Sequence, residues 1–168
     1  MKKILVILIL ILLTGCGIYD LTNFILPNDE EFTTIVVSLD TPQKICKFME
    51  ENFEHKLTWT AYSPYQMWLL NTKAGDCNDY ATFAIFVAHY HGYEVYQIKI
   101  HANYESLVWT YHMLGVFVED GKYNYSSNWE YYPIQVDTFE EIVNHYIKDI
   151  KLYGFFVYDY DYNLVGGK

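Results

Sequence analysis

The amino-acid sequence predicts an α+β domain in which a helix carrying a reactive cysteine packs on an antiparallel sheet. Apolar residues recur at helical spacing as far as Gly92 and then alternate with polar residues, as they do in strands. Asp120 and Gly121 separate two alternating segments and have the composition of a tight hairpin turn. Strands joined by such a turn run antiparallel, and the helices bury their apolar faces against the sheet.

The first residues form an export signal. Two lysines precede an uninterrupted apolar run, Ile4 to Leu13, which has the length of a signal-peptide core and is too short to span a bilayer. The run ends in LTGC, which resembles the lipobox of bacterial lipoproteins. The resemblance implies that residues 1–15 are removed and that Cys16 is acylated, which would anchor the protein to a membrane of the cell envelope on the exported side. An ordinary signal peptide with an incidental cysteine is the alternative.

Composition narrows the possible functions of the remaining chain. Its length suits one domain with a core, so we assign residues 16–40 to a lipidated tether and residues 41–168 to a monomeric domain. The sequence has 21 acidic residues against 11 lysines, which disfavours a nucleic-acid partner. Aromatic residues make up 19% of it, which argues against a disordered stalk. Within the tether we expect one short extended piece at Thr33 to Leu39.

The domain begins with a helix from Thr41 to about His55. Thr41 is a suitable N-cap and Pro42 suits the first turn. Cys46 lies in this helix, where a small apolar core residue is expected; a disulfide with Cys77 is the alternative outside the cytoplasm. The later elements are a short helix at Tyr65–Asn71, a longer helix from Asp76 to near Gly92, strands at Glu94–His101, Leu107–Glu119 and Lys122–Asn128, a helix at Thr138–Lys148 capped by Asp137, and a last edge strand at Leu152–Tyr162 with Asp159 and Asp161 outward.

The segment from Gly75 to Gly92 carries the chemistry. Asp76 is a good N-cap, so Cys77 falls on the first helical residue. The unpaired N–H groups and the positive end of the helix dipole there favour a thiolate and supply an oxyanion donor. Small residues follow at helical spacing and let a sheet approach this face closely; they are Ala81, Ala84 and Ala88.

The hairpin register locates a histidine on the same predicted core. With Asp120 and Gly121 at the turn, alternation pairs Leu114 with Ser127. Counting back by two from Leu114 along the apolar row gives His112, diagonal to Ser127 and opposite Trp129. We expect this row to face the Cys77 helix. A hydrogen-bonded core histidine is the alternative.

Two motifs resemble the transglutaminase-like superfamily. GDCNDYA, residues 75–81, resembles its nucleophile motif, and His112 followed by an apolar strand, Asp120, Gly121 and an aromatic strand resembles its second motif. The resemblance implies a papain-like core with the nucleophile helix packed on an antiparallel sheet. It also implies that His112 pairs with Cys77, whose thiolate attacks an amide carbonyl to give an acyl-enzyme.

The sequence departs from that family at the third catalytic position. The family's aspartate falls on Ser127, which faces correctly but carries no charge. Asn128 has the chemistry to orient an imidazole, yet alternation points it away unless a bulge turns it inward. Gln66 and Trp59 are the candidate oxyanion side chains, whereas Asp79 is expected to be a structural hydrogen-bond acceptor.

Two functions follow from these residues. The first is a membrane-anchored thiol hydrolase or acyltransferase, a cysteine peptidase in the broad sense, that acts on amide bonds of a protein or cell-wall peptide. The second is an inactive domain of the same fold that binds a peptide, glycan or partner protein through a tyrosine-rich surface. Neither needs a cofactor. A metal site is not expected, because His89 and His91 diverge on their helix.

Overall fold

The computed structural model describes residues 26–168 apart from 59, 71–72, 104–109 and 149–150. Its helices are α2 (Glu30–Ser38), α3 (Pro42–Asn52), α4 (Pro64–Leu69), α5 (Cys77–Tyr90) and α6 (Phe139–Ile147). Its strands are β1 (Glu54–His55), β2 (Ala74–Gly75), β3 (Val95–Asn103), β4 (Thr110–Glu119), β5 (Lys122–Ser127), β6 (Glu130–Val136), β7 (Lys151–Asp159) and β8 (Leu164–Gly167). The leader, Cys16 and Trp59 lie outside the described residues.

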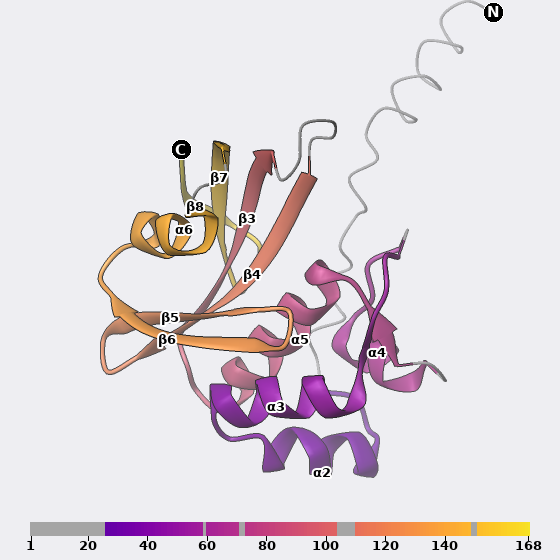
Figure 1. Ribbon diagram of the computed structural model, residues 1–168. Helices are drawn as coiled ribbons and strands as arrows, with labels where there is room; N and C mark the ends of the chain where they lie inside the picture. The colour runs from indigo at the N-terminus through magenta and orange to yellow at the C-terminus, as the bar shows by residue number, and fades with distance from the viewer. Residues whose placement is uncertain (1–25, 59, 71–72, 104–109, 149–150) are drawn as a thin grey trace, which may run out of the picture.

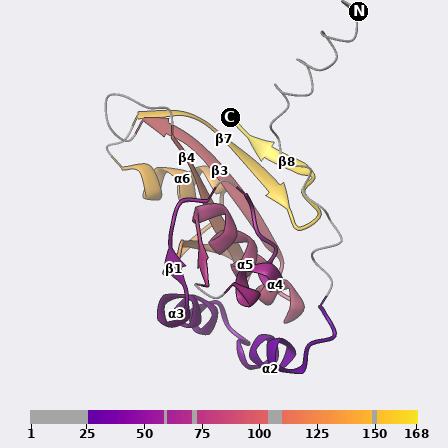
Figure 2. The same ribbon diagram turned by 90° about the vertical axis from the view of Figure 1, so that its right-hand side faces the viewer.

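A six-stranded antiparallel sheet in the order β6-β5-β4-β3-β7-β8 forms the centre of the structure. Helices α3, α4 and α5 lie on one side of it and α6 lies on the other (Figures 1 and 2). The α+β class is therefore confirmed, and the helix that begins at Cys77, α5, packs on the antiparallel sheet. No helix among the described residues has the length and apolarity needed to cross a membrane.

The helix ends follow the capping residues closely. The Thr41 hydroxyl accepts from the Lys44 N–H, which confirms Thr41 as the cap of α3. The predicted cap of α6 is wrong by one residue. Thr138 takes that position, because its hydroxyl and the Glu141 carboxylate each accept a backbone N–H from the other residue, while Asp137 bonds to Lys122 instead.

The segment predicted as an extended piece of tether is instead a helix that belongs to the core. The Asp29 carboxylate accepts from the Phe32 N–H and starts α2. Phe32 and Val36 are one helical turn apart and fully buried against α5, with Phe86 stacked on Phe32 at 6.2 Å. The apolar β-branched residues between Thr33 and Leu39 suggested a strand, but burial at this spacing stabilises the helix.

The predicted hairpin register is confirmed. Leu114 pairs with Ser127, and Asp120 and Gly121 both have positive φ, as the tight turn requires. The next hairpin was missed: Asn128 and Trp129 form its turn, with Asn128 at φ 52°, and β6 returns beside β5. Trp129 therefore does not lie opposite His112 in a ladder.

The C-terminal strand prediction is wrong in its extent. The chain turns after Asp159, whose carboxylate accepts from the Asn163 N–H at 2.8 Å, and returns as β8. Asp161 lies in this turn, and β7 is inside the sheet with β8 at its edge.

Strand β4 is buried on both faces, which corrects the predicted facing of His112. Gly115 faces α5: a Cβ added there would lie 3.5 Å from the Ala84 Cβ. The alternate row, with Leu114 and Val116, packs with α6 residues in a second cluster, and His112 belongs to this row. Both rows are apolar, so alternation gave the pairing but not which row meets α5.

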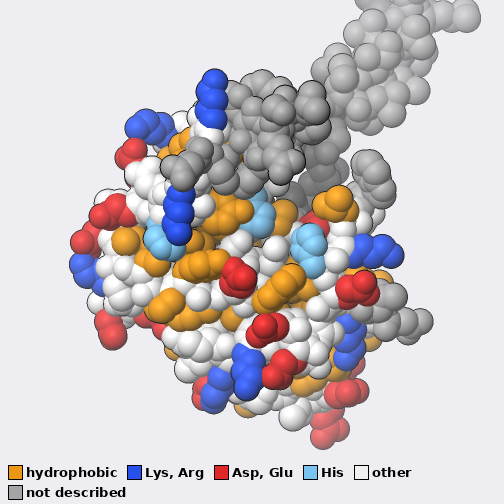
Figure 3. All heavy atoms as spheres, viewed as in Figure 1, with side chains coloured by type: hydrophobic (Ala, Val, Ile, Leu, Met, Phe, Trp, Pro, Cys, Tyr) orange, Lys and Arg blue, Asp and Glu red, His pale blue; other side chains and the backbone are white. Residues whose placement is uncertain are grey.

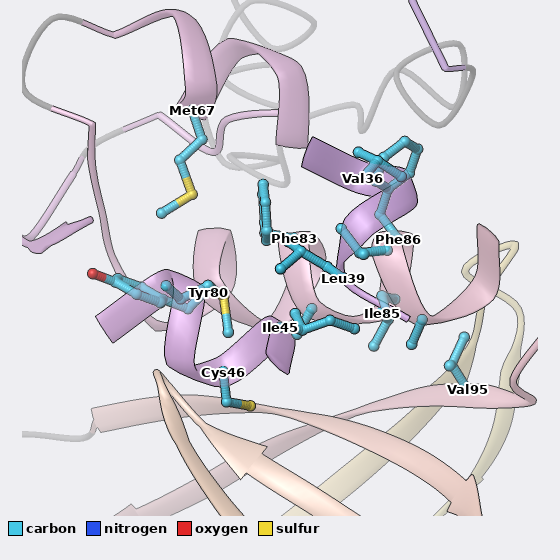
Figure 4. Close-up of a cluster of buried hydrophobic side chains, with 14 of the residues drawn as sticks. Val36, Leu39, Ile45, Cys46, Met67, Tyr80, Phe83, Ile85, Phe86 and Val95 are labelled. Atoms are coloured by element: carbon cyan, nitrogen blue, oxygen red, sulfur yellow. The ribbon is translucent and has the colours of Figure 1, made fainter. Parts of the chain in front are cut away.

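The larger core cluster lies around α3 and α5 (Figure 4). Cys46 is 2% exposed in this cluster and its thiol is free, as is that of Cys77, so the packing role predicted for Cys46 is confirmed. Phe83 is stacked on Phe48 at 6.0 Å and lies edge-on to Phe53 at 5.0 Å, which ties α3 to the face of α5 that points away from the sheet.

Replacing Phe32 with alanine is expected to lower the free energy of unfolding by about 3–5 kcal/mol, because it leaves a cavity between α2 and α5. Val37→Ala is the matched control on the same helix: Val37 is 50% exposed, and the expected change is within about 0.5 kcal/mol. Urea unfolding followed by tryptophan fluorescence measures both. Equal, small effects would show that α2 is a tether rather than part of the core.

Candidate functional site

A capping box and a short β-bridge define the start of α5, the helix that carries Cys77. The Asp76 carboxylate accepts from the Asn78 N–H at 3.0 Å, and the Asp79 carboxylate accepts from the Asp76 N–H at 2.9 Å. This capping box makes Cys77 the first residue of α5, as predicted. Just upstream, β2 pairs in parallel with β1, so that His55 lies opposite Gly75.

Asp79 has the structural role that was expected of it. The carboxylate is buried and also accepts from the Tyr62 N–H at 2.7 Å and from the Thr58 hydroxyl at 3.2 Å. Burial raises the pKa of Asp79 to about 6, and these hydrogen bonds oppose the rise. A Cβ on Gly75 would lie 2.8 Å from the Asp79 Cβ, so glycine is needed there for the carboxylate to pack. Asp79 thus ties the loop before α4 to the start of α5.

The Cys77 thiol is half-buried and uncharged at neutral pH. Burial raises the pKa of the thiol, a backbone hydrogen bond from Met113 partly opposes this, and the Asp76 carboxylate raises it further. The expectation that the helix start would favour a thiolate is therefore wrong for the resting protein. Loss of water around the sulfur outweighs the helix dipole.

The His112 imidazole is held between a strand and a helix. Its Nε2 lies 2.9 Å from the Ser127 Oγ, as the predicted register required. The Tyr146 ring of α6 stacks on it, with centroids 5.0 Å apart and planes 4° apart. Burial lowers the pKa of His112 to about 4, with a further contribution from the charge of His55. The ring is neutral at pH 7 and its plane is fixed.

Cys77 and His112 approach the same end of β4 from different sides. The backbone of Met113, the residue after His112, is near enough to the thiol to lower its pKa, while the imidazole projects toward α6. The β4–β5 ladder ends at the pair of Leu114 and Ser127, so both groups lie where β5 stops. The structure thus brings His112 and Ser127 together, whereas the described residues show no hydrogen bond between the Cys77 thiol and the His112 imidazole.

Asn128 is not joined to His112. It occupies the turn after β5, and among the described residues its buried Oδ1 has no hydrogen-bond partner. The bulge that would have turned Asn128 toward the imidazole is absent from the described β4–β5 ladder, which is regular up to Ser127. Ser127 is therefore the residue that contacts the far ring nitrogen.

Of the two side chains predicted as oxyanion donors, the structure describes only Gln66, which caps a helix. The Gln66 Oε1 accepts from the Ser63 N–H at 2.9 Å and so caps α4. Trp59 lies outside the described residues. The backbone N–H of Cys77 has no partner within its helix, because the first N–H groups of any helix lack one.

Sequence reasoning missed two aromatic residues beside the site. Trp129 lies 5.5 Å from the Tyr80 ring and 6.1 Å from the His55 ring, measured between centroids. His55 was assigned to the end of a helix, but α3 stops at Asn52 and β1 carries His55 to the nucleophile loop. His55 lies in a two-residue strand and Trp129 in a turn. Elements this short have no periodic sequence pattern, so neither residue could be located from the sequence.

An open groove of about 530 Å³ adjoins these rings. One wall is α3, and the opposite wall is the β5–β6 turn, which contains Trp129, with the first residues of β6. The lining residues are Gln43, Cys46, Lys47 and Glu50 on α3, and Trp129, Glu130, Tyr131 and Tyr132 opposite. On the face that carries α3 and the β5–β6 hairpin, acidic and basic side chains are interspersed with apolar ones (Figure 3).

The two histidines at the C-terminal end of α5 make structural contacts. His89 stacks on Tyr160 at 3.7 Å between centroids, and the His91 Nε2 lies 2.8 Å from the carbonyl oxygen of Val36. In the part of the chain that the structure describes, no three His, Cys, Asp or Glu side chains are grouped to hold a metal ion.

No protein-family model and no curated protein matches this chain. Its function is therefore inferred from the residues and their arrangement.

Alkylation by iodoacetamide is expected to distinguish the two thiols of the folded domain. Cys77 reacts in the native protein, and its rate rises with pH through and beyond the ordinary thiol range, because burial raises its pKa. Cys46 reacts only on unfolding, since burial raises its pKa to about 12. A Cys16→Ser protein leaves only these thiols to follow by mass spectrometry. A Cys77 rate that is already constant below pH 7 would instead indicate a pre-formed thiolate.

Proposed function

We propose that this protein is an exported, lipid-anchored thiol hydrolase or acyltransferase that acts on amide bonds of a protein or cell-wall peptide. Cys77 is the nucleophile and His112 is the base. The observation that supports this most is the position of the groups near the start of β4: the Met113 backbone, next in sequence to His112, lowers the pKa of the Cys77 thiol, and Ser127 lies 2.9 Å from the His112 Nε2. The motif spacing that resembles transglutaminase-like domains assigns the same three positions.

Both groups are neutral at rest, so His112 acts as a general base, and its low pKa makes it a weak one. The raised pKa of Cys77 and the lowered pKa of His112 disfavour a thiolate–imidazolium pair. In the proposed state the His112 Nε2–H donates to the Ser127 hydroxyl, which leaves the Nδ1 lone pair to take the thiol proton. The proton moves only as the sulfur bonds to the carbonyl carbon.

The reaction then proceeds in two halves. The oxyanion that forms on the carbonyl faces the Cys77 N–H, and the imidazolium gives its proton to the amine nitrogen as the C–N bond breaks. A thioester on Cys77 remains. Water or a second amine attacks it and loses a proton to His112, and the C–S bond breaks to restore the thiol.

Ser127 sets the efficiency of this chemistry. A hydroxyl holds the ring but does not offset the positive charge of the imidazolium, whereas a carboxylate does both. Replacing the carboxylate by a neutral group costs about 10⁴ in rate in serine proteases. A low turnover is therefore expected, and the same observation favours the second candidate function, an inactive domain that binds its ligand through the groove at Trp129.

Acyl transfer from p-nitrophenyl acetate tests the proposal. Intact-mass spectrometry is expected to show one acetyl group on Cys77 and none after Cys77→Ala, while the matched variant Cys46→Ala is acetylated normally. His112→Ala slows acetylation by about 10²–10⁴, the usual contribution of a general base. Ser127→Asp raises the rate. If Cys77 is acetylated no faster than a free thiol, or His112→Ala changes nothing, the domain binds rather than catalyses.

The anchor rests on the LTGC sequence at residues 13–16. Cells that express the protein are expected to incorporate labelled palmitate into it and to retain it in the membrane fraction. Cys16→Ser abolishes both, whereas Cys46→Ser leaves both unchanged. Label that survives Cys16→Ser would show that the anchor is elsewhere or absent.

A further inference from the structure

We infer that Lys99 binds a carboxylate of the substrate peptide, on the part of the sheet that extends past the start of α5. The inference rests on the proposed function, because it assigns this surface to the same substrate. The ends of β3, β4 and β7 continue beyond the first turn of α5 (Figures 1 and 2). A peptide whose amide reaches Cys77 therefore lies against these strand ends.

The strand registers place Lys99 close to Cys77. Gln97 of β3 faces α5, since its Nε2 donates to the Thr82 hydroxyl at 3.0 Å. Lys99 is two residues further along the same strand and so points to the same face, and its ladder partner on β4 is Met113. The Met113 backbone is the one that lies near the Cys77 thiol. Lys99 is therefore one strand away from the nucleophile.

Aromatic rings lie beside the ammonium group of Lys99. Its Nζ is 4.6 Å from the centroid of the Tyr111 ring, which stacks on His101 with centroids 4.5 Å apart. On the other side, Phe156 of β7 pairs with Lys99. Tyr111 is 56% exposed and Phe156 is 44% exposed. This surface thus combines a cation, which binds an anion, with exposed rings, which cover the apolar groups of a peptide.

No carboxylate among the described residues neutralises Lys99, because their ion pairs all involve other lysines. At the start of α5 the Asp76 carboxylate already accepts from the Asn78 N–H and the Thr58 hydroxyl. The Asp79 carboxylate is buried. The formal net charge of the chain is −10, so an anionic peptide is repelled by most of the protein and attracted here. Carboxylates, on acidic side chains or at chain ends, are the anions of an unmodified peptide.

Binding to the Cys77→Ala protein tests the inference without turnover. The probes are pentapeptides with a central glutamine, alanines elsewhere, a dye at the N-terminus and an amidated C-terminus. One series carries glutamate at each flanking position in turn, with glutamine as the neutral counterpart, and one further peptide has a free terminal carboxylate. At one position or more, the carboxylate is expected to tighten binding about three- to tenfold at low salt, by fluorescence anisotropy. High salt reduces this advantage.

Variants of Lys99 show where the advantage arises. Lys99→Met abolishes it, whereas Lys99→Arg, which keeps the charge, retains it. Lys122→Met is the matched control: it removes an equal charge at the far end of the β4–β5 hairpin and leaves the advantage intact. The salt series needs no change at Lys99, so it tests the inference even where Lys99→Met does not fold.

The two kinds of carboxylate separate the two sources of the ligand. An advantage for glutamate indicates an acidic side chain, and an advantage for the free chain end indicates a C-terminal carboxylate. No advantage from either, an advantage unaffected by salt, or one that survives Lys99→Met overturns the inference. A protein that forms an acyl-enzyme without this advantage keeps the proposed function and loses the site. An advantage in a protein that forms no acyl-enzyme removes the proposed catalysis and leaves the binding site standing.

Discussion

The close packing of α5 on β4 at Gly115 determines where the start of α5, and with it Cys77, lies. A Cβ built on Gly115 would lie 3.5 Å from the Ala84 Cβ and from the Ala81 carbonyl oxygen, so helix and strand are separated by little more than one methyl group. Because the helix is held this closely, its first residue reaches the part of β4 where the Met113 backbone lowers the pKa of the Cys77 thiol. Larger side chains on both surfaces would move the helix away from the strand and Cys77 away from Met113.

Burial then decides the protonation of the two groups. Water is withheld from the Cys77 sulfur by the sheet and from the His112 ring by Tyr146, and each loss of water disfavours the charged form. A neutral thiol and a neutral imidazole beside a serine differ from the thiolate and imidazolium that a nearby carboxylate would stabilise. In the proposed mechanism the charges arise only with the tetrahedral intermediate, which makes Ser127 the residue that limits the rate.

Local chemistry in the sequence predicted the hairpin register and the start of α5, and tertiary contacts decided which way the side chains face. The turn at Asp120 and Gly121 fixed the register to Ser127, and the cap at Asp76 placed Cys77. The facing of β4 was not predictable, since both of its rows are apolar. Strand β6 was missed because Pro133 weakens a strand pattern, although proline is tolerated at the sheet edge that β6 occupies. His55 and Trp129 reach the site through a two-residue strand and a turn that no periodicity marks.

The most direct test of the account is whether the Cys77 thiol interacts with the His112 imidazole. The ¹⁵N chemical shifts of the His112 imidazole report this in the native protein and in Cys77→Ala, without a substrate. The account predicts a neutral ring at pH 7 with Nε2 protonated toward Ser127 in both proteins, and an Nδ1 shift that changes when the thiol is removed. Identical Nδ1 shifts in the two proteins would contradict it, because the imidazole would then have no contact with the sulfur it is proposed to activate.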